Sequence, residues 1–464
     1  MLYPKKRINN NFINNNMLID RTTKPKEKGK IDFHLPTIKR FTLSNGLKII
    51  FVEKNNLPIV QFSFISQVGS KNDPANKKGL AYLTSLLIDE GAGEFDALQL
   101  DDKIESLGSI LKCSADQDSF SISILSLKEN LEESLNILSL IVSQPRFEET
   151  DFIREKQKLL TKILQLRDNP EYIASSTFRK IIYKDSPYAS PTIGYYKDVE
   201  NIKTEAIKEF YNENITIDTS TLLVVGKIKM DELKNLIEKY FSNWKTKKHK
   251  KIKFNSIPPT KTNYYFVHKD GAAQTQLRIG MISKGRKSKD FYARTIMNSI
   301  LGGQFSSRIN LNLREDKGFT YGASSSYQYN KHGGSFIVST GVQSIHTGES
   351  ISEILKELDG IRKGITEREV NFSKSYLIKR YPALFETYSQ VASNLMLMTI
   401  HDLPDNYFDT YIDNLDKITI DEILSAAKEN VLLDQMVVLA VGDKKVVLPQ
   451  LEKLSKNRII ELEI

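Results

Sequence analysis

The sequence predicts an α+β fold of two homologous domains, each a mainly antiparallel β-sheet covered by helices. The first observation behind this prediction is an internal repeat, because residues 222–241, LLVVGKIKMDELKNLIEKYF, resemble residues 437–455, VVLAVGDKKVVLPQLEKLS. Gly226 and Gly442 align at a separation of 216 residues. The same separation relates two further matches, Glu213-Asn214 with Glu429-Asn430 and Glu133-Ser134 with Glu349-Ser350. A repeat this long indicates two copies of a domain rather than a solenoid.

The second observation is that strand-like and helix-like segments alternate within the first copy. Residues 41–55, FTLSNGLKIIFVEKN, predict two strands around an Asn-Gly turn, which is the strongest short hairpin signal. Residues 60–69 and 118–127 alternate apolar and polar side chains, as half-buried strands do. Residues 79–91 predict a buried helix, and residues 131–142 carry apolar side chains at helical spacing.

The second copy repeats this order of elements. Residues 274–282 and 333–342 predict strands, whereas residues 291–301 and 348–361 predict helices. Strands that pair like hairpins and alternate with helices favour an α+β layer in each copy.

The expected domain boundaries follow from composition. Residues 1–32 form a polar N-terminal extension, residues 33–244 the first domain and residues 261–464 the second domain. Residues 245–260 are the predicted linker, because they are basic, contain Pro258-Pro259 and lack any apolar period.

Composition excludes several classes of protein. The net charge of +9 is spread along the chain, and the densest basic runs, residues 24–30 and 245–253, contain no interleaved aromatic residues, so we expect no nucleic-acid partner. The single cysteine allows no disulfide within the chain. No apolar run is long enough to span a membrane, and residues 1–20 lack the apolar core of a secretory signal. We therefore expect a cytoplasmic protein.

The histidines do not form a metal-binding motif. The six histidines are His34, His249, His268, His332, His346 and His401, and no two of them are four residues apart. One cysteine, Cys113, excludes a cysteine zinc site. Only a site assembled from scattered histidines and carboxylates would remain.

Residues 301–327, LGGQFSSRINLNLREDKGFTYGASSSY, are the most informative segment. They place Arg314 and Tyr321 seven residues apart with Gly318 between them. Gly302 and Gly303 are predicted to end the preceding helix with a left-handed cap, and Ser306-Ser307-Arg308 is predicted to start the next one. A structural interpretation of the pair is also possible, with the arginine capping a neighbouring helix and the tyrosine packed at a strand start.

This segment resembles the second-domain signature of the insulinase/pitrilysin family of zinc metallopeptidases, which includes the mitochondrial processing peptidases. The resemblance extends from about Phe33 to the C-terminus through LSNGL, QVGS, Asp168-Asn169-Pro170, SSR and LREDKGFTYG. It implies that Arg314 and Tyr321 contact peptide substrate beside the zinc, and that the two domains form half of a clamshell.

The same resemblance implies that the zinc site of this chain is degenerate. The family's zinc-binding helix reads Gly-x-Ala-His-x-x-Glu-His, whereas this chain has GLAYLTSL, with Tyr82 and Leu86 in place of the histidines and Ser85 in place of the glutamate. The third ligand position falls on Lys162, whose ammonium group would repel zinc. Glu155 stands at the position of a family glutamate close to the ligands, and we expect it to pair with Lys158 or Lys162.

We therefore predict a non-catalytic subunit of a heterodimeric zinc metallopeptidase that binds no cofactor itself. The partner would be a homologous two-domain subunit that holds the zinc, and the substrate a peptide or unfolded polypeptide. Tyr321 would stabilise the oxyanion and Arg314 would bind the substrate backbone. The alternative is a purely structural or binding protein similar to respiratory-complex core subunits. No constellation supports an enzyme that acts alone, so the isolated chain is not expected to cleave peptides.

Overall fold

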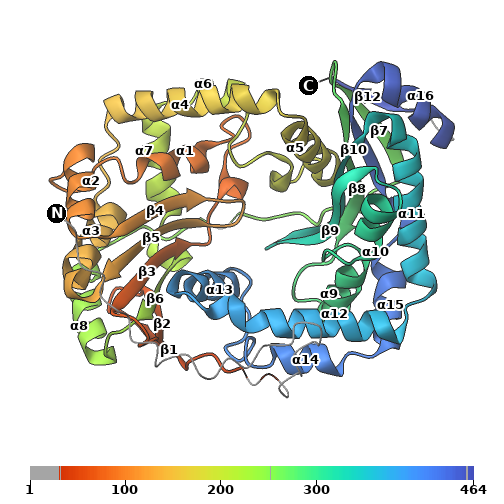
Figure 1. The fold of residues 1–464 in the computed structure, drawn as a ribbon. Helices are drawn as coiled ribbons and strands as arrows, with labels where there is room; N and C mark the ends of the chain where they lie inside the picture. Colours follow the sequence, from red (N-terminus) through yellow and green to blue (C-terminus); the bar gives the residue numbers. More distant parts are fainter. Residues whose placement is uncertain (1–30, 32, 251, 456–457, 464) are drawn as a thin grey trace, which may run out of the picture. The chain divides into compact units, whose positions relative to one another are not determined.

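Two six-stranded sheets organise the part of the chain that the structure describes (Figure 1). The computed structural model describes residues 31, 33–250, 252–455 and 458–463. Residues 34–464 belong to one unit, which contains both sheets. The predicted N-terminal extension, residues 1–32, lies outside the described residues except for Ile31.

The first sheet has the strand order β1-β2-β6-β3-β5-β4. Only β2 and β6 pair in parallel, and all other neighbours are antiparallel. The predicted Asn-Gly hairpin is confirmed, because β1 and β2 pair antiparallel on either side of it. The strands are β1 Ile38–Thr42, β2 Lys48–Glu53, β3 Ile59–Ser66, β4 Ile110–Ala115, β5 Phe120–Leu127 and β6 Ser220–Gly226.

The second sheet has the order β12-β7-β11-β8-β10-β9 and repeats the plan of the first, except that its edge strand β12 follows the other strands in the chain and pairs in parallel with β7. Leu439 pairs with Arg278 in this sheet as Leu223, 216 residues earlier, pairs with Ser63 in the first. The predicted α+β fold with two mainly antiparallel sheets is thus confirmed. The strands are β7 Asn263–His268, β8 Gln274–Ser283, β9 Thr320–Asn330, β10 Gly333–Gln343, β11 Val437–Gly442 and β12 Ile460–Leu462.

Helices bury one face of each sheet against an apolar core. Phe62 and Phe64 of the first sheet are fully buried in one cluster, and Leu277 and Phe336 of the second sheet in another. No helix among the described residues is long and apolar enough to cross a membrane. The helices of the first half are α1 Leu80–Leu87, α2 Ala97–Ser106, α3 Leu131–Ser143, α4 Glu149–Arg167, α5 Pro170–Tyr183, α6 Tyr196–Glu200, α7 Thr204–Asn214 and α8 Met230–Phe241.

The second half follows the same order with one irregular helix. A short π-helix, η5 (Leu311–Asp316), continues directly from α10 (Arg308–Asn310). The helix α15 ends at Asn430, as α7 ends at Asn214, which preserves the repeat seen in the sequence. The remaining helices are α9 Phe291–Leu301, α11 Thr347–Lys363, α12 Glu367–Arg380, α13 Tyr388–Ile400, α14 Tyr411–Lys417, α15 Ile420–Asn430 and α16 Lys444–Leu454.

The two halves exchange one helix each across the sheets (Figure 1). Helix α5 of the first half packs on β8 and β11 of the second sheet, where Ile173 and Phe178 join one buried cluster with Leu439 and Val441. Helix α13 of the second half packs on β3 and β6 of the first sheet. Burying each large apolar side chain contributes about 1.5–3 kcal/mol, so the exchange ties the halves into one folding unit.

The β4–β5 turn and the β9–β10 turn, which are equivalent in the repeat, meet each other. The backbone N–H of Lys331 donates to Asp118 Oδ2 at 2.8 Å, and the Tyr188 hydroxyl donates to Asp118 Oδ1 at 2.7 Å. Lys71 Nζ lies 3.2 Å from Asp118 Oδ1, and both side chains are less than a tenth exposed. The contact between the halves is therefore polar and charged at this point, and apolar along the exchanged helices.

Replacing Asp118 with asparagine should lower the free energy of unfolding by about 3–5 kcal/mol, because the buried Lys71 ammonium would lose its counter-charge. Urea denaturation measures the change. The control is Asp405→Asn, which breaks the exposed Arg40–Asp405 pair and should cost at most about 1 kcal/mol. Equal effects of the two substitutions would contradict a buried ion pair between Lys71 and Asp118.

His401, at the end of α13, should make stability fall in mild acid. Burial, reinforced by the nearby Arg286, lowers the pKa of His401 from its ordinary 6.5 to about 4. Between these two pH values the folded chain binds fewer protons than the unfolded chain, so the free energy of unfolding decreases as pH falls. His401→Gln should flatten this dependence in urea midpoints measured across the window. An unchanged slope would show that His401 is not the group responsible.

Candidate functional site

The Arg314–Tyr321 segment joins the π-helix η5 to the edge strand β9. Arg314 lies on η5, and single π-helical turns are frequently found at functional sites. Gly318 follows with a φ of +67°, which lets the chain turn out of the helix without strain. Strand β9 then begins at Thr320, so Tyr321 stands at the start of an edge strand.

Arg314 is held by an aromatic ring rather than by a strong ion pair. Its guanidinium carbon lies 4.5 Å from the centroid of the Phe305 ring, and Nε is 3.5 Å from Glu315 Oε1. Phe305 itself is 63% exposed. A guanidinium stacked in this way keeps most of its donors free for a ligand.

Tyr321 projects into solvent. Tyr321 is 90% exposed. The start of the strand is nevertheless anchored, because Thr320 Oγ1 donates to Gly341 O at 2.7 Å. In the described part of the chain, no hydrogen bond or ring contact involves the Tyr321 side chain. This exposure argues against the interpretation that the tyrosine merely packs at a strand start.

The prediction of a left-handed cap at Gly302 is wrong, although the helix α9 does end at Leu301. Gly302 has a φ of −162°, which is extended backbone. Its lack of a side chain is required by a close approach, because an added Cβ would lie 2.4 Å from Ser325 Oγ. The carbonyl of Gly302 accepts from Ser325 N at 2.9 Å, and Asn310 Oδ1 accepts from Ala323 N at 3.0 Å. The loop thus binds the outer edge of β9 and fixes Phe305 beside it. The predicted helix start at Arg308 is confirmed.

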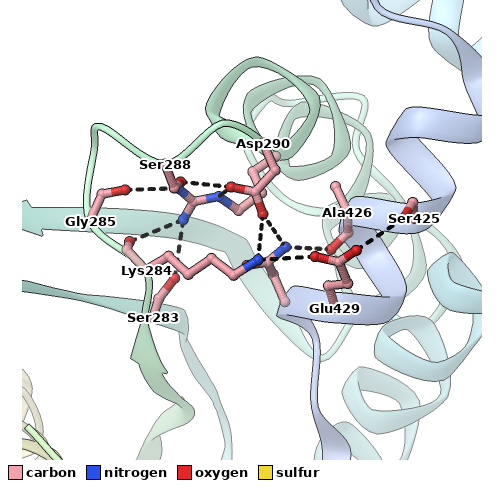
Figure 2. Close-up of polar contacts among 10 residues, drawn as sticks. Ser283, Lys284, Gly285, Ser288, Asp290, Ser425, Ala426 and Glu429 are labelled. Carbon is pink, nitrogen blue, oxygen red and sulfur yellow. Dashed lines mark hydrogen bonds and ion pairs between the residues drawn. The ribbon is translucent and has the colours of Figure 1, made fainter.

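A buried arginine fixes the other end of α9 (Figure 2). Arg294 is fully buried, and Nη1 and Nη2 donate to the carbonyls of Lys284 and Gly285 at 3.1 and 3.0 Å. Its Nε lies 3.2 Å from Asp290 Oδ1. Burial opposes ionisation of Asp290, but hydrogen bonds from Ser288, Lys284 and Asn430 outweigh it and lower the pKa to about 2. Lys284 also pairs with Glu429 of α15 at 3.0 Å, so the network ties α9 to α15.

The predicted degenerate zinc positions lie on α1 and α4, and two of them are in contact. Lys162 Nζ donates to the Tyr82 hydroxyl at 2.9 Å and lies 5.3 Å from the centre of its ring. Ser85 is buried and donates to the Tyr82 carbonyl at 2.7 Å, whereas Leu86 packs partly buried against the first core. These four side chains carry a phenol, a hydroxyl, an alkyl group and an ammonium. Zinc in proteins is bound by histidine, cysteine or carboxylate side chains, so the four do not form a set of zinc ligands.

Glu155, on the next turns of α4, is 7% exposed and paired with cations. Its Oε1 lies 2.6 Å from Lys158 Nζ and 3.2 Å from Arg154 Nε. Of the two predicted partners of Glu155, Lys158 forms the ion pair, whereas Lys162 donates a hydrogen bond to Tyr82. Within the described ranges, no group of three or more His, Cys, Asp or Glu residues is arranged to hold a metal ion.

Sequence reasoning missed two residues of this region. Phe305 carries no signal in the sequence, because an aromatic residue nine positions before Arg314 belongs to no helical or strand period that would place it there. Arg294 could have been noticed, since Asp290, directly before the predicted helix, is four residues from Arg294, but that spacing normally describes a solvent-exposed pair.

Comparison with known proteins agrees with this geometry. Residues 48–195 match the family described as Insulinase (Peptidase family M16), and residues 201–377 match the Peptidase M16 inactive domain. A non-peptidase homolog YmxG of Helicobacter pylori is 23% identical over 402 residues, which cover 86% of this chain and 92% of that protein. The zinc protease PqqE of the same organism is 24% identical over 366 residues, 77% of this chain and 82% of that one. The fold matches the crystal structure of a peptidase M16 inactive domain from Pseudomonas fluorescens with a TM-score of 0.82, 23% identity and coverage of 88% and 98%.

Restoring ligands at positions 82, 85, 86 and 162 should create a zinc site, because the contact between Tyr82 and Lys162 brings α1 and α4 within ligand reach. We expect the combined variant Tyr82→His, Ser85→Glu, Leu86→His and Lys162→Glu to retain about one zinc ion per chain, since two histidines four apart and a carboxylate form a common zinc set. Metal analysis after dialysis measures this.

The control variant keeps Lys162 and carries only the other three substitutions, and it should retain much less zinc. If the full variant folds like the unmodified chain and takes up no zinc, the assignment of these four positions to a former metal site is wrong.

Proposed function

Because the chain belongs to the insulinase family, peptidase family M16, we propose that it is the non-catalytic subunit of a heterodimeric zinc peptidase. The partner in this proposal is a homologous two-domain chain that carries the zinc ligands. This chain contributes Arg314 and Tyr321 to a peptide or unfolded polypeptide held at the partner's site.

The observation that carries the proposal is the contrast between the two sites of the chain. At the former ligand positions, Lys162 Nζ donates a hydrogen bond to the Tyr82 hydroxyl at 2.9 Å, and Ser85 is buried. At the other site, Tyr321 is 90% exposed and the side chain of Arg314 is 36% exposed. Side chains that contact a ligand in a complex have to be accessible before it forms, and these two are.

The chemistry expected of the pair follows from their donors. The zinc ion of the partner would supply the Lewis acid and the activated water. The Tyr321 hydroxyl would donate to the scissile carbonyl oxygen as negative charge develops there. Arg314, oriented by the Phe305 ring at 4.5 Å, would direct its donors to a neighbouring substrate carbonyl. Both contributions come from outside the metal site, so they do not require zinc on this chain.

Substitution of the pair tests the proposal in the reconstituted heterodimer. Tyr321→Phe removes only the hydroxyl of an exposed ring, so folding and assembly should be unchanged, while kcat should fall by about 10²–10³, the usual effect of deleting one oxyanion donor. Arg314→Ala should in addition raise KM, because it removes a contact made in the ground state. Steady-state kinetics on an unfolded peptide measure both.

The matched controls are Tyr82→Phe and Lys162→Ala, which break the Tyr82–Lys162 hydrogen bond and should leave kcat and KM nearly unchanged. Full activity after both Tyr321→Phe and Arg314→Ala would show that the chain acts only as a structural subunit. Peptide cleavage by the isolated chain would equally overturn the proposal.

A further inference from the structure

A cavity of about 160 Å³ lies between the exchanged helix α5 and the second sheet. Arg278 of β8 and Arg179 of α5 both line it. The rest of its polar lining includes four serine hydroxyls, from Ser175, Ser326, Ser335 and Ser339, and also the carboxylate of Glu171. A water molecule needs only about 10–15 Å³ on the same measure, so the cavity has room for a small polyatomic ion.

Arg278 is 3% exposed, yet its partners are almost all neutral. Nη1 donates to the Leu277 carbonyl at 2.9 Å, and Nη2 donates to Ser175 Oγ at 3.1 Å and to the Glu171 carbonyl at 3.4 Å. The nearest carboxylate oxygen, Glu171 Oε1, is 3.9 Å away on a side chain that is 76% exposed. Burial lowers the pKa of Arg278, and this distant carboxylate only partly opposes the effect.

The other buried cations among the described residues have close counter-ions. Lys71 lies 3.2 Å from Asp118, whose side chain is 9% exposed. Arg294 lies 3.2 Å from Asp290, whose side chain is 19% exposed. Burying a charge without such a partner is costly. Arg278 thus lacks the close and largely buried counter-ion that Lys71 and Arg294 have.

A second guanidinium increases the positive charge of the cavity. Arg179 is half-buried on α5, and across the described residues it takes part in no hydrogen bond or ion pair. Among the residues that line the cavity, Glu171 is the one carboxylate, and its side chain is 76% exposed. The two guanidinium groups, set among serine hydroxyls, therefore still provide donors of the kind that a buried carboxylate or phosphate group requires.

The fold does not require arginine at this place. In the equivalent cavity between α13 and the first sheet, the position that matches Arg278 by strand pairing is Ser63. Helix α13 presents Ser389 and Ser393 there, and the one cation in the lining is the exposed Lys112. The buried positive charge is therefore specific to the second sheet.

We propose that the cavity around Arg278 and Arg179 binds an oxyanion. The anion is either a carboxylate of the polypeptide substrate or a free inorganic phosphate. The first source rests on the proposed peptidase function, whereas the second is independent of it. In both cases the planar guanidinium of Arg278 donates to the oxyanion and gains a closer counter-charge than Glu171 provides.

Calorimetric titration of the full chain at constant ionic strength tests the site with two probes. One probe is sodium phosphate. The other is an acidic peptide, compared with a neutral counterpart in which Asp, Glu and the terminal carboxylate are replaced by Asn, Gln and an amide. We expect the unmodified chain to bind phosphate, or to prefer the acidic peptide over the neutral one. Arg278→Gln should weaken that binding by about ten- to a hundredfold, the effect of removing a hydrogen bond to a charged group, and Arg179→Gln should weaken it less.

The matched control is Arg167→Gln, which removes one positive charge from the exposed end of α4, where Arg167 stacks on Tyr196, and should leave binding unchanged. Because Arg278→Gln also removes the hydrogen bonds to Ser175 and the Leu277 carbonyl, the melting temperature of this variant is measured alongside the binding, and Arg179→Gln provides a second variant on an accessible residue. Binding of phosphate alone identifies the inorganic source, and preference for the acidic peptide identifies the substrate. Absence of both, or equal affinity in the unmodified chain and Arg278→Gln, overturns the proposal. Because the titration needs no partner subunit, its failure is distinguishable from failure of the peptidase proposal.

Discussion

The reciprocal exchange of α5 and α13 is the interaction on which the rest of the structure depends. Each half of the chain covers one face of its own sheet with its own helices, and the other face receives a helix from the opposite half. Neither sheet is complete alone, because a β-sheet with one uncovered apolar surface is unstable in water. At the meeting of the two equivalent turns, the backbone N–H of Lys331 donates to Asp118, which adds a directional contact between the halves. Apolar burial supplies the strength of this junction, and the Lys71–Asp118 ion pair within the first half holds the acceptor in place.

The exchange also explains why two equivalent scaffolds carry different chemistry. Because α5 and α13 each cover only part of a face, a cavity remains beside each helix, and its lining is free to differ. Serines line both cavities, but arginines are added only in the second. The same division applies to the other sites, since the positions predicted to correspond to zinc ligands are on α1 and α4 of the first half, and the exposed Tyr321 is on β9 of the second. The repeat therefore fixes equivalent strand backbones in the two halves, while the side chains at equivalent positions can differ.

Much of the fold could be predicted from the sequence, because strands and helices follow local apolar periods and the repeat separation of 216 residues doubles the evidence for each element. The Asn-Gly hairpin and the strands β3, β5, β8 and β10 are of this kind. The helix exchange could not be predicted, since the apolar stripe of α5 says that it is buried but not against which sheet. Gly302 was misinterpreted for the same reason: the close approach to Ser325 that requires glycine comes from a strand more than twenty residues away. The positions of Phe305 and Arg278 could not be predicted either, because they depend on contacts with Arg314 and Ser175 that no local helical or strand period places.

The difference between the two sites can be stated as a difference in what each contributes to folding. Tyr82, Ser85, Leu86 and Lys162 bond or pack against one another or the first core, so the scaffold around them is stable without a metal ion. Tyr321 contributes almost nothing to the stability of the fold, because an aromatic ring stabilises a fold by being buried and nine-tenths of Tyr321 remains in water. Phe305, which stacks on Arg314, is 63% exposed and likewise buries little of its ring. Folding accounts for the first group of residues and leaves the second unexplained. An exposed tyrosine, and an exposed phenylalanine stacked on an arginine, are what a surface presents when its contacts are completed by another molecule.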